Sequence, residues 1–113
     1  MNKTVALANP KLVTILGKVK NYFQENYGND LANIILFGSQ ARGENDLDSD
    51  IDLLVILKNS FDSYKENKKN SAFISEICLE NDIVITCFLM SLNHWQTRNN
   101  AFIRNVKKEG IIL

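Results

Sequence analysis

The most constraining feature of this 113-residue chain is a pair of acidic side chains at the head of a β-prone run. Asp50 and Asp52 stand two positions apart, and the apolar residues 53–57 follow them directly. On a strand, residues i and i+2 point to the same face, so the two carboxylates lie about 7 Å apart along that face. Burying two unpaired aspartates in an apolar sheet is costly, and a divalent metal ion would remove that cost. The pattern therefore predicts a strand that carries a metal site.

A glycine-serine turn begins twelve residues before Asp50. Gly38 and Ser39 follow the apolar run 34–37, and Arg42 comes shortly after them. Glycine lets the backbone approach a phosphate closely, and free N–H groups at the start of a short helical turn bind anions. An arginine adds a charged contact to phosphate. The turn lacks the second glycine and the lysine of a Walker loop, so its weight as a phosphate site comes from the acidic pair beside it.

Hydrophobic spacing predicts an α/β (α+β) fold, with a small mixed sheet packed against helices. The length of the chain predicts a single domain over residues 1–113. Helical periodicity is clear in one segment and weaker in a second, whose polar middle is expected to be exposed and whose inward positions include Tyr64. The predicted elements are helices at 10–27, 61–80 and 99–108, strands at 31–37, 50–57 and 82–90, and a connection at 91–97.

A third carboxylate is predicted near the acidic pair. Asp82 opens the last predicted strand, on the same face as Thr86 and Phe88. If that strand lies beside the strand that begins at Asp50, with the two starts together, the Asp82 carboxylate reaches the same metal. Taken alone, Asp82 also fits an ordinary strand-edge or turn residue.

A calcium loop is a rival interpretation of the acidic segment. Asp46, Asp48 and Asp50 match the first, third and fifth positions of such a loop. The sixth and twelfth positions require glycine and glutamate, but this chain has Ile51 and Leu57 there. The sequence excludes a calcium loop of this type.

The composition of the chain indicates which kinds of partner it binds and which cell compartment it occupies. Thirteen basic and thirteen acidic residues give a formal net charge of zero. A neutral chain offers no electrostatic case for nucleic-acid binding. It also does little to oppose association with a protein partner or a second copy. Cys78 and Cys87 form no CxxC pair and are typical of small buried residues in a reducing compartment. Because we find no signal-peptide core and no run as long as a membrane span, we expect a cytoplasmic protein without a membrane partner.

The motif pair resembles the signature of the DNA polymerase β-like nucleotidyltransferases. The matching stretches are 38–43, Gly-Ser-Gln-Ala-Arg-Gly, and 49–53, Ser-Asp-Ile-Asp-Leu. The similarity covers most of the chain and is greatest to the minimal (MNT-type) branch, whose members are small single domains often encoded beside a helical HEPN-type protein.

This resemblance implies two-metal nucleotidyl transfer. Asp50 and Asp52 would hold magnesium, two ions in all, on the triphosphate of ATP, and Asp82 would take the family's third catalytic, metal-binding carboxylate role. Gly38, Ser39 and Arg42 would bind the phosphates. An acceptor hydroxyl would attack the α-phosphorus and release pyrophosphate.

The resemblance also implies a biological setting. In toxin–antitoxin pairs of this type, the nucleotidyltransferase is the antitoxin and transfers AMP to a hydroxyl, commonly of a tyrosine, on a HEPN-type toxin. Two alternatives stay open: a transferase that modifies a small molecule such as an aminoglycoside, and a non-catalytic nucleotide-binding subunit that neutralises its partner by contact. The short chain argues against the small-molecule alternative, because such enzymes usually carry an added substrate domain.

Overall fold

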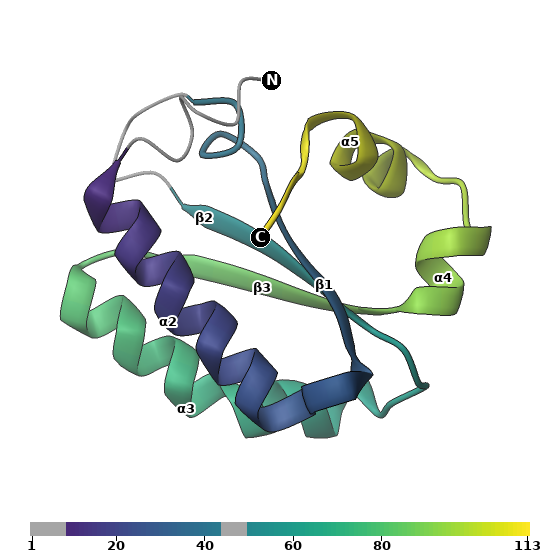
Figure 1. The fold of residues 1–113 in the computed structure, drawn as a ribbon, viewed down its shortest axis with the longest axis horizontal. Helices are drawn as coiled ribbons and strands as arrows, with labels where there is room; N and C mark the ends of the chain where they lie inside the picture. The colour runs from purple at the N-terminus through teal and green to yellow at the C-terminus, as the bar shows by residue number, and fades with distance from the viewer. Residues whose placement is uncertain (1–8, 44–49) are drawn as a thin grey trace.

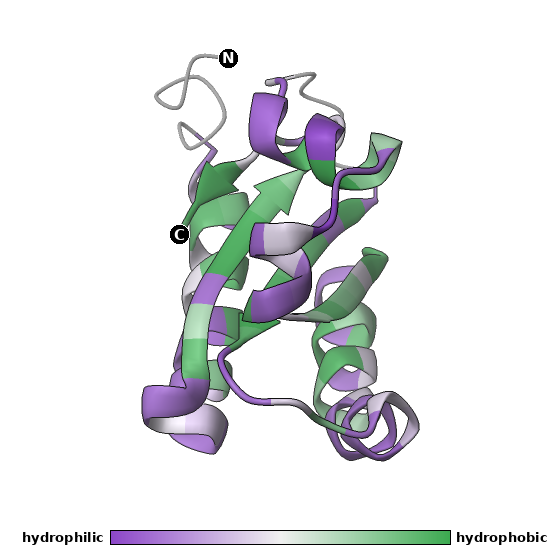
Figure 2. Cartoon of the chain, turned by 90° about the vertical axis from the view of Figure 1, so that its right-hand side faces the viewer, coloured by the Kyte–Doolittle hydropathy of each residue, from purple (hydrophilic) through white to green (hydrophobic). Residues whose placement is uncertain are grey.

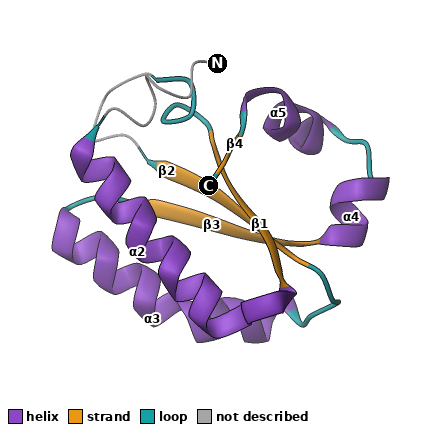
Figure 3. Ribbon diagram, in the orientation of Figure 1, coloured by secondary structure: helices purple, strands orange, loops and turns teal. Residues whose placement is uncertain are grey.

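The computed structural model describes residues 9–43 and 50–113 as a four-stranded mixed sheet with helices on both faces (Figure 1). The strands lie in the order β3-β2-β1-β4. They are β1 (Leu31–Phe37), β2 (Ile51–Leu57), β3 (Ile85–Ser91) and β4 (Ile111–Ile112). The helices are α2 (Pro10–Tyr27), α3 (Ser63–Asn81), α4 (Leu92–Thr97) and α5 (Ala101–Glu109), with a 3-10 turn, η1 (Gly28–Asp30), between α2 and β1 (Figure 3).

The first helix has the predicted limits because each end carries its own stop signal. The Asn9 side chain accepts hydrogen bonds from the backbone N–H groups of Lys11 and Leu12, and Pro10 occupies the first helical position. Gly28, at a φ of 51°, ends the helix in a conformation that other residues rarely adopt. Local chemistry alone therefore defines α2.

Two apolar layers enclose the sheet. One face packs against α2 and α3, and its cluster includes Leu16, Phe23, Leu53 and Ile77. The other face packs against α4 and α5, where Leu54 and Val106 are buried together. Figure 2 shows hydrophobic residues along most of the strands, in keeping with a sheet buried on both sides.

The register of β2 with its neighbours positions Asp52. Strand β2 runs antiparallel to β1, which pairs Asp52 with Phe37, and parallel to β3, which pairs Asp52 with Thr86. In a sheet, paired residues point to the same face. Asp52 therefore lies with Phe37 and Thr86 on the face that packs against α4 and α5.

The third strand begins at Ile85, three residues later than predicted, because α3 runs to Asn81 and its cap and a short turn occupy residues 82–84. Asp82 is the C-cap of α3, in a left-handed conformation with a φ of 52°, and not the first residue of a strand. The backbone N–H groups of Asp82 and Ile83 both donate to the carbonyl of Cys78, which closes the helix. Because aspartate tolerates this conformation, the helix ends without a glycine. The prediction that Asp82 shares a strand face with Thr86 was wrong.

The C-terminal third also holds an extra helix and an extra strand. The predicted connection at 91–97 contains α4, which begins at a Ser91 cap that accepts a hydrogen bond from the His94 N–H. After α5, the two residues of β4 pair with Ile35 and Leu36 of β1. Such short elements depend on packing against the sheet more than on their own sequence pattern.

A polar network joins α2 to α3 where exposed residues were predicted. Asn70 is buried; its side chain accepts a hydrogen bond from the Tyr22 hydroxyl at 2.8 Å and donates one to the Tyr27 hydroxyl at 2.9 Å. The Tyr27 hydroxyl in turn donates to Glu66 at 2.8 Å. Tyr64, predicted to point inward, is 76% exposed. The aromatic residues of α2 take up the space between the two helices, so the polar middle of α3 faces them.

Within 9–43 and 50–113, we find no helix with the length and apolar character needed to cross a membrane.

Candidate active site

Asp52 and the turn after β1 form the centre of the candidate site. Gly38 has a φ of 75°, and a Cβ placed on it would overlap the Oδ2 atom of Asp52. The Arg42 N–H donates to the Gly38 carbonyl at 3.2 Å, and Gln40 and Ala41, which are 3% and 0% exposed, anchor the turn in the core. The glycine-serine turn is therefore folded directly against the carboxylate of Asp52, as expected for a phosphate-binding backbone beside a metal-binding acid.

Asp52 is half-buried, and its surroundings oppose its ionisation. Burial raises the pKa of Asp52 above its ordinary value, and the nearby carboxylates of Asp50 and Glu109 raise it further, while the Arg42 guanidinium lowers it. The site thus concentrates negative charge that one arginine offsets only in part. A divalent cation bound here would remove the repulsion between the acidic pair.

The acidic pair fits magnesium as a partial ligand set. Asp50 is exposed and directly precedes β2, and Asp52 is the second residue of that strand. Among the residues that the structure describes, no group of three His, Cys, Asp or Glu side chains is placed to hold a metal. Magnesium commonly takes only one or two protein carboxylates and completes its shell with substrate phosphates and water. Asp50 and Asp52 suit that mode of binding.

Asp82 is at the same end of the sheet as Asp50 but not beside Asp52. It lies three residues before β3, exposed, at the end of α3. The residue paired with Asp52 on β3 is Thr86. The predicted proximity of the two strand starts is confirmed by the Ile51 N–H, which donates to the Val84 carbonyl at 2.9 Å. The third-carboxylate role of Asp82 has no contact among the described residues that tests it, and the place of Asp82 as an exposed helix cap favours the alternative of an ordinary turn residue.

The structure adds Glu109, which the sequence analysis missed. Its carboxylate accepts a hydrogen bond from the Gly38 N–H at 3.2 Å and forms an ion pair with Arg42 at 3.0 Å. The one sequence feature that distinguishes Glu109 is its position in the last turn of a helix, where an acidic residue opposes the helix dipole. That feature marks Glu109 as unusual but does not say what it contacts.

Ser39 and the acids of the excluded calcium loop complete the set of sequence candidates. Ser39 is half-buried in the turn, directly after Gly38. Asp46 and Asp48 lie outside the described residues. Of the predicted site residues, the structure brings together Gly38, Arg42, Asp50 and Asp52, and Ser39 follows Gly38 in the turn.

The fold and the two motifs together are those of one class of protein, in which a small mixed sheet carries an acidic strand beside a glycine turn. The chain belongs to the nucleotidyltransferase family, because the model of the "Nucleotidyltransferase domain" family matches residues 16–113. The fold is that of the polymerase β-like nucleotidyltransferases, which confirms the predicted fold class.

Several known proteins are similar to this chain. MJ0141 of Methanocaldococcus jannaschii, named as a candidate protein adenylyltransferase, is 30% identical over 101 residues, which span 89% of this chain and 97% of that protein. The crystal structure of a candidate nucleotidyltransferase from Sulfolobus solfataricus matches with a TM-score of 0.63 at 18% identity, covering 99% of this chain and 87% of its own.

A toxin–antitoxin complex also contains a similar fold. A chain in the structure of a tri-AMPylated HEPN toxin in complex with MNT antitoxin, from Shewanella oneidensis, matches with a TM-score of 0.56 at 17% identity. The match covers 88% of this chain and 68% of that one. At this level of identity the likeness establishes the fold.

Proposed function

We propose that this nucleotidyltransferase is Mg²⁺-dependent and transfers AMP from ATP to a hydroxyl of a partner protein. The observation that carries the proposal is the contact between the Gly38 turn and Asp52, because a glycine turn beside a carboxylate suits a phosphate and the metal that accompanies it. The name of MJ0141 supports a protein as the acceptor.

Each residue of the site has a role in this proposal. Asp50 and Asp52 would hold magnesium, and the chemistry it would supply when bound is neutralisation of charge on the triphosphate. Gly38 and Ser39 offer the backbone and a hydroxyl to the β- and γ-phosphates, and Arg42 adds a charged contact. The acceptor oxygen forms a bond to the α-phosphorus as its hydroxyl proton passes to solvent, and the bond to the bridging oxygen breaks to release pyrophosphate.

We further propose a HEPN-type helical protein as the acceptor, modified on a tyrosine, with this chain as the antitoxin. The support is the likeness to the Shewanella complex, in which the toxin itself is AMPylated. We place the reaction in the cytoplasm, where ATP and Mg²⁺ are abundant and the free thiols of Cys78 and Cys87 stay reduced.

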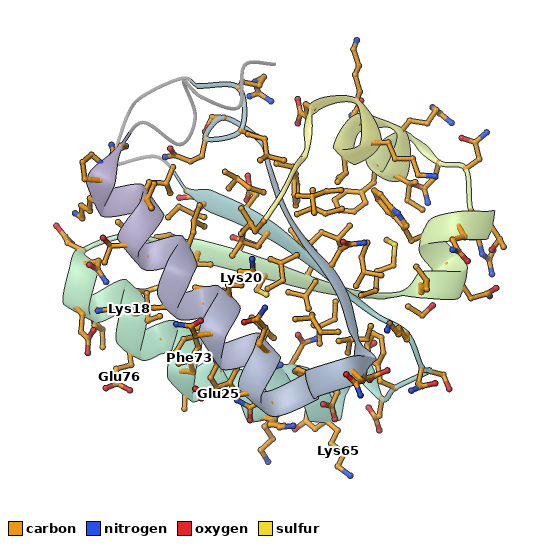
Figure 4. All side chains as sticks on the ribbon, in the orientation of Figure 1. Lys18, Lys20, Glu25, Lys65, Phe73 and Glu76 are labelled. Carbon is orange, nitrogen blue, oxygen red and sulfur yellow. The ribbon has the colours of Figure 1, made fainter. Side chains whose placement is uncertain are left out.

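Transfer of label from α-labelled ATP tests the proposal. The purified protein is added, with Mg²⁺, to an extract of the source organism that lacks this gene. A labelled protein band that appears with the wild type and with Glu76→Gln, but not with Asp52→Asn, is the expected result. Glu76 points away from α3 into solvent (Figure 4). Because α3 and Asp52 lie on opposite faces of the sheet, Glu76→Gln matches the loss of charge and leaves the site intact.

Three outcomes have distinct meanings. A labelled band whose mass and peptide sequence identify a helical HEPN-type protein supports the antitoxin role. Label that appears only in small molecules would contradict a protein acceptor. Binding of Mg·ATP without any transfer would contradict catalysis and leave a nucleotide-binding subunit.

A further inference from the structure

Glu109 binds the two groups that the proposed function assigns to the triphosphate, the Gly38 N–H and the Arg42 guanidinium. Its Oε1 atom accepts the Gly38 N–H at 3.2 Å, and its Oε2 atom lies 3.0 Å from an Arg42 guanidinium nitrogen. A backbone amide beside a guanidinium is an anion-binding arrangement. In this structure the bound anion is a carboxylate of the chain itself.

The packing of α5 holds Glu109 in this position. Ile103 and Val106 bury α5 against the sheet, and Gly110 follows Glu109 directly. A Cβ on Gly110 would overlap both the Val106 carbonyl and the Ile35 side chain, so the end of α5 lies closer to β1 than another residue would allow. The next residue, Ile111, pairs with Leu36 of β1, two positions before Gly38. The end of α5 and the pairing of β4 with β1 together hold the Glu109 carboxylate next to the turn after β1.

Among the described residues, the polar contacts of Glu109 are with Gly38 and Arg42, and its position in the helix does not explain its charge. At the last turn of α5, Lys107 and Lys108 suit the negative end of the helix dipole, whereas Glu109 opposes it. Its carboxylate also adds to the negative field around Asp52. The partial exposure of the ion pair, 43% for the Arg42 side chain and 24% for Glu109, means that it adds little to stability. An exposed pair of this kind is also open to replacement by a solution anion.

We propose that Glu109 is an internal competitor for the phosphate-binding turn, which a polyphosphate displaces when it binds. The inference rests on the proposed nucleotide site at Gly38 and Arg42. The displacement makes Glu109 a specificity-determining residue: an anion must bring enough charge and enough oxygens to replace a carboxylate that is already in place. A triphosphate with its magnesium meets this condition, and a single inorganic phosphate does not.

Calorimetric titration of Glu109→Gln with Mg·ATP and with inorganic phosphate tests the inference. The amide of glutamine keeps the size of the side chain and an acceptor for the Gly38 N–H, but it lacks the charge. We expect Mg·ATP to bind the variant about tenfold more tightly than the wild type, because a charged competitor has been removed. Inorganic phosphate should become measurable as a ligand of the variant. Glu76→Gln, which removes a charge far from the turn, should match the wild type.

The outcomes separate this inference from the proposed function. If the wild type binds Mg·ATP and Glu109→Gln binds it equally or more weakly, Glu109 positions Arg42 and does not compete, and the inference fails while the nucleotide site stands. If neither protein binds Mg·ATP, both proposals fail. A second measurement uses the unchanged chain: in NMR titrations with Mg·tripolyphosphate, the Gly38 amide and the Glu109 carboxyl carbon should shift together, and a shift of the amide alone would contradict displacement.

Discussion

Gly38 and Asp52 lie so close together that no side chain fits between them. A Cβ on residue 38 would overlap Oδ2 of Asp52, and the φ of 75° at Gly38 is strained for any residue with a side chain. The antiparallel pairing of Phe37 with Asp52 forces this approach, since the turn begins at the residue after Phe37. One backbone position thus connects the sheet register to the chemistry of the site.

Gly38→Ala should lower both stability and activity. We expect a loss of about 1–3 kcal/mol in the free energy of unfolding from the strained φ, and a roughly 100-fold loss of transfer from the displaced carboxylate. Chemical denaturation and label transfer measure the two effects. Gly17→Ala is the control: Gly17 lies inside α2 with no atom within 4 Å of an added Cβ, so this change should raise stability by about 0.5–1 kcal/mol and leave transfer intact. An active Gly38→Ala protein would contradict the role of this contact.

Asp52→Asn should abolish transfer and stabilise the metal-free protein at neutral pH. Burial and the Asp50 carboxylate raise the pKa of Asp52, so the folded protein holds this proton more tightly than the unfolded chain does. Stability of the wild type therefore falls as the pH rises from the ordinary carboxyl pKa through the raised one. Because partial exposure screens the effect, we expect a gain of about 0.5 kcal/mol or slightly more for the variant.

Thermal unfolding of both proteins across pH 3–8, in the presence of a chelator, measures this difference. The gain should disappear at acid pH, where Asp52 is neutral in the folded and unfolded states alike. A variant that is less stable than the wild type at every pH would show that the Asp52 carboxylate makes stabilising contacts that outweigh its burial.

Asp82→Asn should have a small effect on transfer. Asparagine suits the left-handed C-cap position as well as aspartate does, and the residue next to Asp52 on β3 is Thr86. We expect transfer within about twofold of the wild type, because a change at an exposed helix cap outside the site should alter the reaction barrier by less than about 0.5 kcal/mol. A loss as large as that of Asp52→Asn would establish Asp82 as the third carboxylate, and the same label-transfer assay decides between the two.

Asn70→Ala should destabilise the packing of α2 on α3. The change leaves the Tyr22 hydroxyl without its acceptor and removes the donor to Tyr27, at a cost of about 1–3 kcal/mol. Urea denaturation should show a lower midpoint with an unchanged slope. Asn67→Ala, an exposed change on the same helix, is the control and should be nearly neutral. Equal midpoints for the two variants would contradict the importance of the network.

The parts that the sequence predicted well are those with local causes. Asn9, Pro10 and Gly28 define α2 through capping and backbone freedom, and the β-prone run 53–57 directly after Asp50 and Asp52 predicts β2. The close approach of the turn after β1 to Asp52 follows from Gly38, which has no side chain to prevent it. Each of these features can be recognised in a window of fewer than about twenty residues.

The parts that escaped prediction depend on tertiary contacts. The β-prone sequence after residue 82 favoured a longer strand, but packing lets α3 run on to Asn81, and Asp82 becomes a helix cap. Asn70 is buried because Tyr22 and Tyr27 from another helix face it. Glu109 reaches the site only because Gly110 lets α5 approach β1. No periodicity within one segment contains such information.

The bond from Gly38 to Glu109 spans 71 residues of chain. Its amide proton is shielded by a carboxylate that arrives with α5 and β4, and not by the neighbouring strand. The rate at which that proton exchanges with deuterium therefore reports how often the Glu109 carboxylate leaves the Gly38 amide, whether its side chain turns away or the C-terminal segment lifts from the sheet. A single backbone amide at the site thus acts as a built-in reporter of its contact with α5.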